Sequence, residues 1–248
     1  MRKLALFAVM LATAAAAAYA FWDGWIRLNT PSEVMFPVRG IDVSHHQGVI
    51  DWERVRAAGV RFAYIKASEG ADFVDASFEA NWRGAKAAGI ARGAYHFFTL
   101  CTPVRPQVDN FVATVFEVGE LPPALDLELG GNCANPPAVA DVKAMIEELV
   151  PMISKRFGEP PIVYTTYEFR ELYLCPTCVN GSLPLLWIRD VIWKPRLTNA
   201  EPWVFWQHHN RGRLDGIDGP VDLDVFRGDV AAFGRYLDGR RLDIVRGK

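Results

Sequence analysis

The sequence predicts an α/β barrel of eight strands, and three observations support this prediction. Strand-like and helix-like segments alternate after residue 40, with glycines following the helices. Such alternation is typical of a parallel sheet, either closed or doubly wound. Eight strand-like segments can be counted, and the helices are concentrated in the first half of the chain. No linker or change of composition divides residues 40–238, so we expect one barrel with a helix-poor closing section.

The predicted strands are short apolar segments bounded by turn residues. They span residues 40–44, 60–66, 90–98, 124–128, 161–165, 185–188, 203–207 and 221–225. The predicted helices span residues 51–58, 77–88, 106–116 and 138–157, and three of them stop at Gly59, Gly89 and Gly158. After residue 185 the strands are separated by loops without long helices. The chain has 248 residues, which is long enough to bury the core of one large barrel.

The N-terminal residues predict export. Two basic residues precede an uncharged apolar run over residues 4–22, and Ala18-Tyr19-Ala20 fits a small-x-small cleavage site. The run is also nearly long enough to span a bilayer, so an N-terminal membrane anchor competes with a cleaved signal peptide. Both interpretations export the remaining chain, which would be periplasmic or secreted. An uncleaved helix would hold it at the inner membrane.

These predictions divide the chain into four parts. Residues 1–22 form a signal peptide or anchor, residues 23–38 a linker or ordered extension, residues 39–240 the barrel, and residues 241–248 a basic tail. The formal net charge of −2 argues against nucleic acid as a partner, because no basic excess exists to neutralise phosphates. We expect a monomer.

Export gives the four cysteines a predicted role. In an oxidising compartment, Cys101, Cys133, Cys175 and Cys178 can form two disulfides. Cys175 and Cys178 can close locally, which leaves Cys101 to reach Cys133, but three connectivities are possible. A zinc site or a redox motif is the alternative. The chain has a single CxxC and no thioredoxin-like context, which disfavours both.

Two acids stand out on the segment that follows Pro122-Pro123. Because side chains alternate along a strand, Asp126 and Glu128 share one face, while three leucines line the other. Close like charges tend to raise the pKa of one member. A protonated acid beside an ionised carboxylate is what cleavage of a glycosidic bond requires. The alternative is a structural pair of acids neutralised by Arg or Lys.

In a barrel, functional residues lie at the C-terminal ends of the strands. Aromatic platforms with convergent hydrogen-bonding groups suit a sugar, whose rings have apolar faces and hydroxyl rims. The residues at these strand ends are Asp42, His45, His46, Tyr64, Lys66, Tyr95, His96, Asp126, Glu128, Tyr164, Trp187, Gln207, Asp222 and Asp224. The alternative for the aromatic members, such as Tyr64, Tyr95 and Trp187, is that they only fill the barrel.

An ordered series of motifs resembles the lysozymes of glycoside hydrolase family 25, the N-acetylmuramidases. The matching blocks lie at residues 40–48, 50–52, 62–70, 93–98, 125–128, 162–165, 186–188, 206–207 and 221–226. The resemblance implies an irregular TIM-like barrel of five β/α units closed by three further strands. It also implies cleavage of the β-1,4 bond between N-acetylmuramic acid and N-acetylglucosamine in peptidoglycan, without a metal or cofactor.

The resemblance also implies roles for single residues. Glu128 matches the general acid, and Asp126 matches the partner that orients the 2-acetamido group of the substrate. Asp42 and Asp222 match the two other active-site carboxylates. The pocket positions are Tyr64, Tyr95, Tyr164, Trp187 and Gln207, and we expect Lys66 at the same rim to contact substrate. The favoured mechanism is substrate-assisted retention, in which the acetamido carbonyl attacks C1; the alternative makes Asp42 or Asp222 the nucleophile or base.

Three other functions compete with this prediction. A chitinase-type barrel also uses Asp-x-Glu, but its longer pattern needs acids where this chain has Leu121 and Ala124. A metal-dependent hydrolase could use His45, His46 and His96 with nearby acids, yet adjacent histidines on a strand point to opposite faces. The third alternative is a catalytically silent glycan-binding protein of the envelope on the same barrel. The four acids Asp42, Asp126, Glu128 and Asp222 argue against it, because a groove that only binds glycan has little reason to keep buried carboxyl groups.

Overall fold

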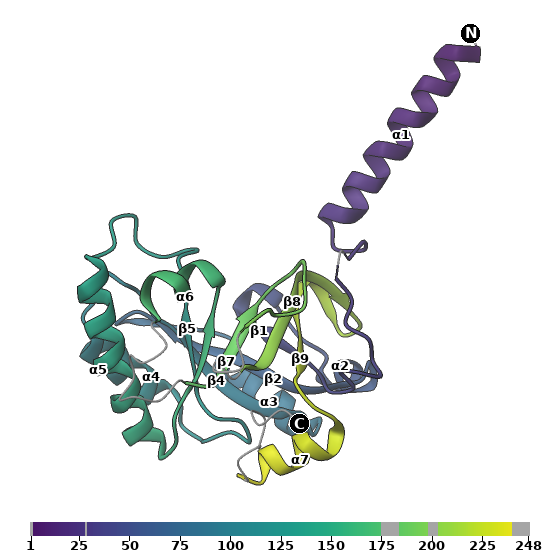
Figure 1. Ribbon diagram of the computed structural model, residues 1–248. Helices are drawn as coiled ribbons and strands as arrows, with labels where there is room; N and C mark the ends of the chain where they lie inside the picture. Colours follow the sequence, from purple (N-terminus) through teal and green to yellow (C-terminus); the bar gives the residue numbers. More distant parts are fainter. Residues whose placement is uncertain (1, 28, 175–183, 198–202, 240–248) are drawn as a thin grey trace.

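A computed structural model describes residues 2–27, 29–174, 184–197 and 203–239. Its nine strands form one sheet in the order β1-β9-β8-β7-β6-β5-β4-β2-β3, and pairing of β1 with β2 closes eight of them into a barrel (Figure 1). The strands are β1 (Arg39–Val43), β2 (Val60–Glu69), β3 (Phe73–Val74), β4 (Ala91–Phe97), β5 (Ala124–Leu127), β6 (Ile162–Thr165), β7 (Leu186–Arg189), β8 (Trp203–Leu214) and β9 (Ile217–Phe226). The predicted eight-stranded barrel is confirmed.

Most of the helices follow the early strands, whereas α1 precedes the barrel and α7 follows its last strand. They are α1 (Arg2–Trp22), the 3₁₀ helix η1 (His45–Gln47), α2 (Trp52–Ala57), α3 (Phe78–Ala87), α4 (Val104–Thr114), α5 (Val139–Phe157), α6 (Tyr167–Tyr173) and α7 (Val230–Leu237). One of the helices α2 to α6 follows each of the first five barrel strands, so the five β/α units are confirmed. Strands β1, β2 and β4 to β8 run parallel, and β9 pairs antiparallel with both β8 and β1.

Besides the 3₁₀ helix η1, three elements were not predicted from the sequence. The helices α6 and α7 are short, with seven and eight residues, so their apolar periodicity is weak. Each begins at a polar cap instead: Thr166 accepts from the Phe169 backbone N–H and Asp229 from that of Ala232. The third element, β3, has two residues and adds antiparallel to the end of β2.

Two hydrophobic clusters fill the molecule. Leu125 and Leu127 of β5 face outward and pack with α5 side chains such as Ile146 in the layer between barrel and helices. The barrel interior holds a second, largely aromatic cluster. Phe233 of α7 belongs to this interior cluster and contacts the Phe62 ring at 5.8 Å. The helix α7 therefore covers the N-terminal end of the barrel, and the C-terminal mouth stays open.

The N-terminal helix α1 extends away from the barrel (Figure 1). The residues after it are ordered against the β8–β9 hairpin: Arg213 pairs with the Asp23 carboxylate, and its Nε donates to the Asp23 carbonyl at 2.9 Å. No helix in the described part of the chain is both long and apolar enough to cross a membrane. The signal peptide stays a prediction, and the basic tail at 241–248 lies outside the described residues.

Candidate active site

A cavity of about 390 Å³ opens at the C-terminal mouth of the barrel. Acidic, aromatic and amide side chains from most of the barrel strands share its surface, together with η1 and the loop after β5. The lining residues are Asp42, Val43, Ser44, His46, Gln47, Lys66, Glu69, Tyr95, Phe97, Asp126, Glu128, Gly130, Gly131, Tyr164, Trp187, Gln207 and Asp222. Nine of the ten side chains predicted for the site are among them.

Tyr64 is the exception, because it does not line the cavity. Phe62, Tyr64 and Lys66 alternate inward along β2, so each lies about 6.6 Å further along the strand than the one before. Only Lys66 reaches the mouth. Tyr64 is fully buried and stacks under Trp187 with ring centroids 4.7 Å apart. Its role in the structure is to support the Trp187 ring from below.

Asp126 lies on β5 and Glu128 directly follows its last residue, and both line the cavity, as the alternation predicts. Burial raises the pKa of Asp126 well above its usual range, and the nearby Glu128 carboxylate adds to this. Burial also raises the pKa of Glu128, while the cations Arg189 and Lys66 act in the opposite direction. Two coupled acids in this environment hold a proton at a pH where isolated carboxyls have lost it.

Three aspartates meet between β1 and β9. Asp42 is directly opposite Asp222 in the strand register and lies within hydrogen-bonding reach of both Asp222 and Asp224. Burial raises the pKa of all three, and repulsion between neighbouring carboxylates reinforces the effect. The Gln207 amide fixes one end of this cluster: its Nε2 donates to Asp42 Oδ2 at 2.9 Å, and its Oε1 accepts from the Tyr164 hydroxyl at 3.0 Å.

Lys66 is fixed at the rim of the cavity. Its ammonium group pairs with the Glu69 carboxylate at 2.7 Å and lies over the rings of Phe97 and Phe73, at 5.1 and 5.5 Å from the centroids. The cation is therefore held by neighbours on both sides. It is also close enough to Asp126 and Glu128 to oppose the rise in their pKa values.

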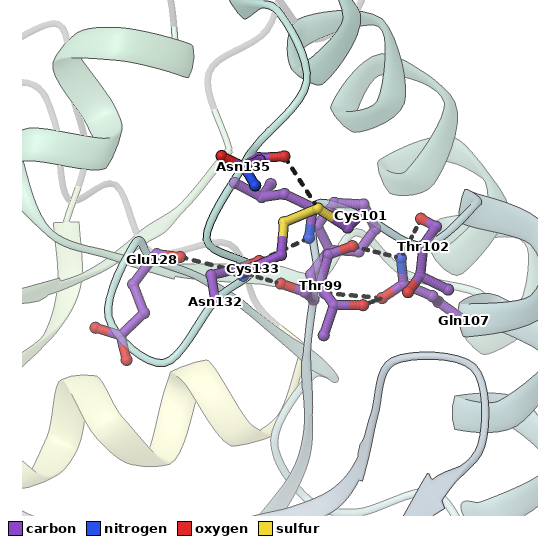
Figure 2. Close-up of a disulfide and its surroundings, with 10 residues drawn as sticks. Thr99, Cys101, Thr102, Gln107, Glu128, Asn132, Cys133 and Asn135 are labelled. Carbon is purple, nitrogen blue, oxygen red and sulfur yellow. Dashed lines mark hydrogen bonds between the residues drawn. A yellow bond between two sulfur atoms is a disulfide. The ribbon is translucent and has the colours of Figure 1, made fainter.

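The loop after β5 is tied to the loop after β4 (Figure 2). Asn132 Nδ2 donates to the Glu128 carbonyl at 3.1 Å and to the Phe98 carbonyl at 2.9 Å. A disulfide between Cys101 and Cys133 joins the same two loops. This pairing is one of those that the sequence left open. The other two cysteines, Cys175 and Cys178, lie outside the described residues.

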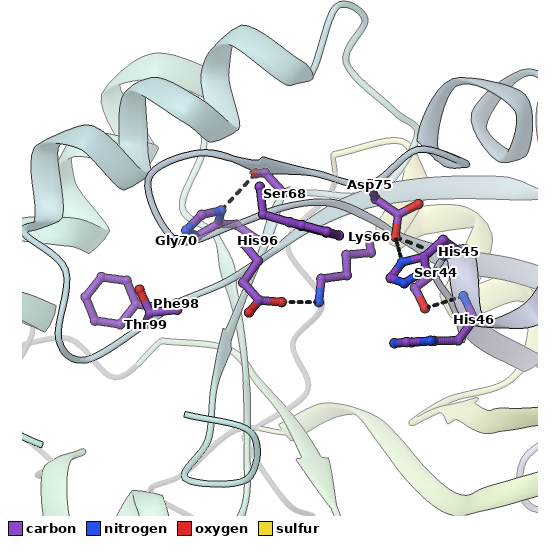
Figure 3. Close-up of polar contacts among 12 residues, drawn as sticks. Ser44, His45, His46, Lys66, Ser68, Gly70, Asp75, His96, Phe98 and Thr99 are labelled. Carbon is purple, nitrogen blue, oxygen red and sulfur yellow. Dashed lines mark hydrogen bonds and ion pairs between the residues drawn. The ribbon is translucent and has the colours of Figure 1, made fainter. Parts of the chain in front are cut away.

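The histidines considered for a metal site have other partners (Figure 3). His45 Nδ1 lies 2.8 Å from Asp75 Oδ2. His96 is buried between the Ser68 hydroxyl at 2.9 Å and the Gln107 amide at 3.4 Å, and burial lowers its pKa to about 4. Within the described ranges, no group of three or more His, Cys, Asp or Glu side chains is arranged to hold a metal ion.

Sequence reasoning missed several residues of the cavity wall. Gln47 comes from η1, Glu69 from the end of β2, and Gly130 and Gly131 from the loop after β5. The motif blocks did contain the first two, so their position next to Asp42 and Lys66 was the available signal. His46 was predicted at the end of the first strand, and it does line the cavity. The glycines carry no side-chain chemistry, and only the course of the loop places them at the cavity.

The fold and the site together define a closed α/β barrel with a carboxylate floor at its C-terminal mouth. A model of the glycosyl hydrolases family 25 matches residues 41–217. The uncharacterized protein YegX of Escherichia coli O6:H1 is 36% identical over 210 residues, covering 82% of this chain and 75% of YegX. Lysozyme M1 of Streptomyces globisporus is 34% identical over 216 residues, covering 78% of this chain and 69% of that protein.

Solved structures agree with the sequence matches. A family 25 glycosyl hydrolase from Bacillus anthracis superposes with a TM-score of 0.71 at 35% identity, covering 80% of this chain and 92% of that one. A bacterial lysozyme from Streptomyces coelicolor superposes with a TM-score of 0.70 at 31% identity, covering 82% and 98%. The chain belongs to glycosyl hydrolases family 25.

Proposed function

We propose that this protein is a muramidase, which hydrolyses the β-1,4 bond between N-acetylmuramic acid and N-acetylglucosamine in peptidoglycan. The observation that carries the proposal is the pair Asp126 and Glu128 on the cavity floor, with burial raising the pKa of both carboxyls. A carboxyl whose pKa is raised holds its proton to a higher pH and can protonate the leaving oxygen of a glycoside. Membership of a family that includes named lysozymes supports the same substrate class.

Glu128 is the proposed general acid. Its carboxyl is less buried than that of Asp126 and neighbours the cavity-lining glycines Gly130 and Gly131, so a bound glycan strand can reach it. Arg189 and Lys66 limit the rise of its pKa, so the group can give up its proton and later take one back. In the second half of the reaction the Glu128 carboxylate would activate water.

Asp126 is the proposed positioning group for the substrate. Its Oδ1 is buried and has no hydrogen-bond partner in the described part of the chain. A buried acceptor of this kind is suited to the N–H of a 2-acetamido group, whose carbonyl oxygen can then attack C1. We favour this substrate-assisted route with retention over direct attack by Asp42 or Asp222. Asp42 already accepts a hydrogen bond from Gln207 and lies in a cluster of three acids, so it is less available as a nucleophile.

The N-terminal segment and the disulfide support the further proposal that the protein acts outside the cytoplasm. Peptidoglycan lies there, and disulfides such as Cys101–Cys133 persist in oxidising compartments. Detection of the mature chain in a periplasmic or culture-medium fraction would test this. Confinement to the cytoplasm would contradict it.

The catalytic proposal is tested with Glu128→Gln. We expect this variant to lose clearance of a peptidoglycan suspension by about a hundredfold or more, while it still binds glycan. Glutamine keeps the size and polarity of the side chain but carries no exchangeable carboxyl proton. If the wild-type protein binds glycan and clears none, the barrel is a silent binding protein, and the muramidase proposal fails.

A further inference from the structure

Three aromatic rings continue from the cavity onto the outer surface of the mouth. We call His46, His45 and Phe73 the rim strip. The His46 side chain lines the cavity, its ring lies 4.0 Å from that of His45, and the His45 ring lies 5.7 Å from that of Phe73. Phe73 is 39% exposed, although it is a large apolar side chain. The strip thus presents a row of ring faces and edges to solvent beside the catalytic acids.

Hydrogen bonds and strand pairing hold the rim strip in place, and Figure 3 shows the contacts of its two histidines with Asp75 and Ser44. Ser44 and Gln47 form a capping box around η1, which fixes the turn that carries both histidines. The backbone N–H and the ring Nδ1 of His45 both contact Asp75 Oδ2, at 2.9 and 2.8 Å, and the Asp75 side chain is fully buried. Phe73 is held by the pairing of β3 with the end of β2. Rigid side chains bind a ligand at a low entropic cost.

Two charged side chains lie beside the rim strip and neutralise each other as an ion pair. Lys66 lies over the Phe73 ring and pairs with Glu69, and both charged groups line the cavity. The pair therefore offers a donor and an acceptor with little net charge. This combination matches the hydroxyl and acetamide groups of a neutral sugar, and the adjacent rings match its apolar face. A charged stem peptide would meet no unpaired charge of opposite sign in this pair.

We propose that the rim strip is an additional sugar-binding subsite, which takes a further N-acetylhexosamine unit of the glycan strand beyond those in the cavity. The proposal rests on the proposed muramidase function, because it extends the same substrate along the same mouth. It predicts that the enzyme prefers long glycan strands to short ones, and that Phe73 contributes to this preference without taking part in the reaction.

The test compares cleavage of a short and a long peptide-free glycan, a tetrasaccharide and an octasaccharide of alternating N-acetylglucosamine and N-acetylmuramic acid. In Phe73→Ala we expect the ratio of kcat/KM for the long glycan to that for the short one to fall about fivefold, mainly through KM. Val74→Ala is the matched control, because Val74 is the exposed neighbour of Phe73 on β3 and does not line the cavity. Its ratio should equal that of the wild type. Thermal unfolding of both variants checks that β3 is intact.

The outcomes separate this proposal from the proposed function. An equal loss on both glycans, or no loss on either, overturns the subsite. A loss seen only when the glycan carries stem peptides also overturns it, because the strip would then bind peptide. If the wild type cleaves neither glycan, the muramidase proposal fails. In that case the rim strip is tested by glycan binding alone. The single variant Glu128→Gln is compared with the double variant Glu128→Gln/Phe73→Ala. The subsite requires that the double variant binds the long glycan more weakly and the short glycan equally well.

Discussion

The indole Nε1 of Trp187 donates a hydrogen bond to Asp224 Oδ1 at 2.8 Å. Trp187 lines the cavity, whereas Asp224 lies behind it with 1% of its surface exposed. The Trp187 ring is therefore fixed by a carboxylate at its edge and by the Tyr64 ring beneath it. A tryptophan held in one orientation gives the cavity wall a defined shape.

Replacing Asp224 tests this positioning role. Asp224→Leu removes the acceptor, and we expect kcat/KM to fall by about tenfold because the Trp187 ring loses its fixed orientation. Asp224→Asn keeps a side-chain oxygen and should stay within about threefold of the wild type. Tryptophan fluorescence should report a changed environment only in the leucine variant. Equal activity of the two variants would contradict the role assigned to Asp224.

Arg189 is predicted to set the upper pH limit of activity. Burial raises the pKa of Glu128, and the positive charge of the Arg189 guanidinium lowers it. In Arg189→Gln the Glu128 carboxyl should keep its proton to a higher pH, so the basic limb of the kcat/KM profile should move upward. Arg83→Gln is the charge-matched control, since Arg83 lies on the outside of α3 and pairs with Glu79. A limb that shifts equally in both variants, or that moves downward in Arg189→Gln, would count against Glu128 as the acid.

The disulfide should contribute strongly to stability. It closes a loop with a sequence separation of 32 residues, for which the chain-entropy model gives about 3 to 4 kcal/mol. We expect the double variant Cys101→Ser/Cys133→Ser to lose about this much free energy of unfolding in a denaturant titration. A loss below about 1 kcal/mol would show that the surrounding hydrogen bonds hold the two loops without the covalent bond.

Asn132 should affect activity more than its contribution to stability explains. In Asn132→Ala the Glu128 and Phe98 carbonyls lose their donor, so the backbone that carries the proposed acid is less constrained. We expect kcat to fall several-fold with little change in KM, because substrate contacts in the cavity remain. Single-turnover and steady-state rates measure the effect, and Asn135→Ala, at the exposed end of the same loop, is the control. An unchanged kcat in Asn132→Ala would show that Asn132 does not position Glu128 for the reaction.

Acid should destabilise the fold through His208. Burial lowers its pKa to about 4, below its ordinary value of 6.5, so the unfolded chain takes up the proton first as the pH falls. Stability from this histidine is present above about pH 6.5 and is lost between there and about pH 4, by roughly 3 kcal/mol. His208→Gln cannot titrate, so its free energy of unfolding should fall less over this range. Identical pH dependence in the two proteins would refute the assignment.

Much of the barrel was predictable because its strands are short apolar runs and glycines end its helices. The strands β8 and β9 are longer than predicted, since their hairpin continues beyond the barrel as a partly exposed ribbon of polar residues, which gives little apolar signal. The acids Asp126 and Glu128 could be found by strand alternation alone. Tyr64 could not be placed, because alternation gives the face of a strand but not the depth along the barrel.

Contacts between segments that are distant in the sequence could not be predicted either. The hydrogen bond from Trp187 to Asp224 and the tie between Asn132 and Glu128 depend on strand register and loop course, which no local pattern encodes. The Cys101–Cys133 pairing was one of three connectivities for the same reason. Residue types at strand ends predicted the kind of chemistry, and only the three-dimensional arrangement separated groups that line the cavity from groups that support it.

We propose that this barrel cleaves the muramyl bond of peptidoglycan with retention of configuration at C1. Mass spectrometry of the released fragments, with NMR of the new anomeric centre in the first minutes, tests it most directly. We predict products with N-acetylmuramic acid at the reducing end, formed first as the β-anomer. Fragments with N-acetylglucosamine at the reducing end, or with the α-anomer formed first, would contradict the account.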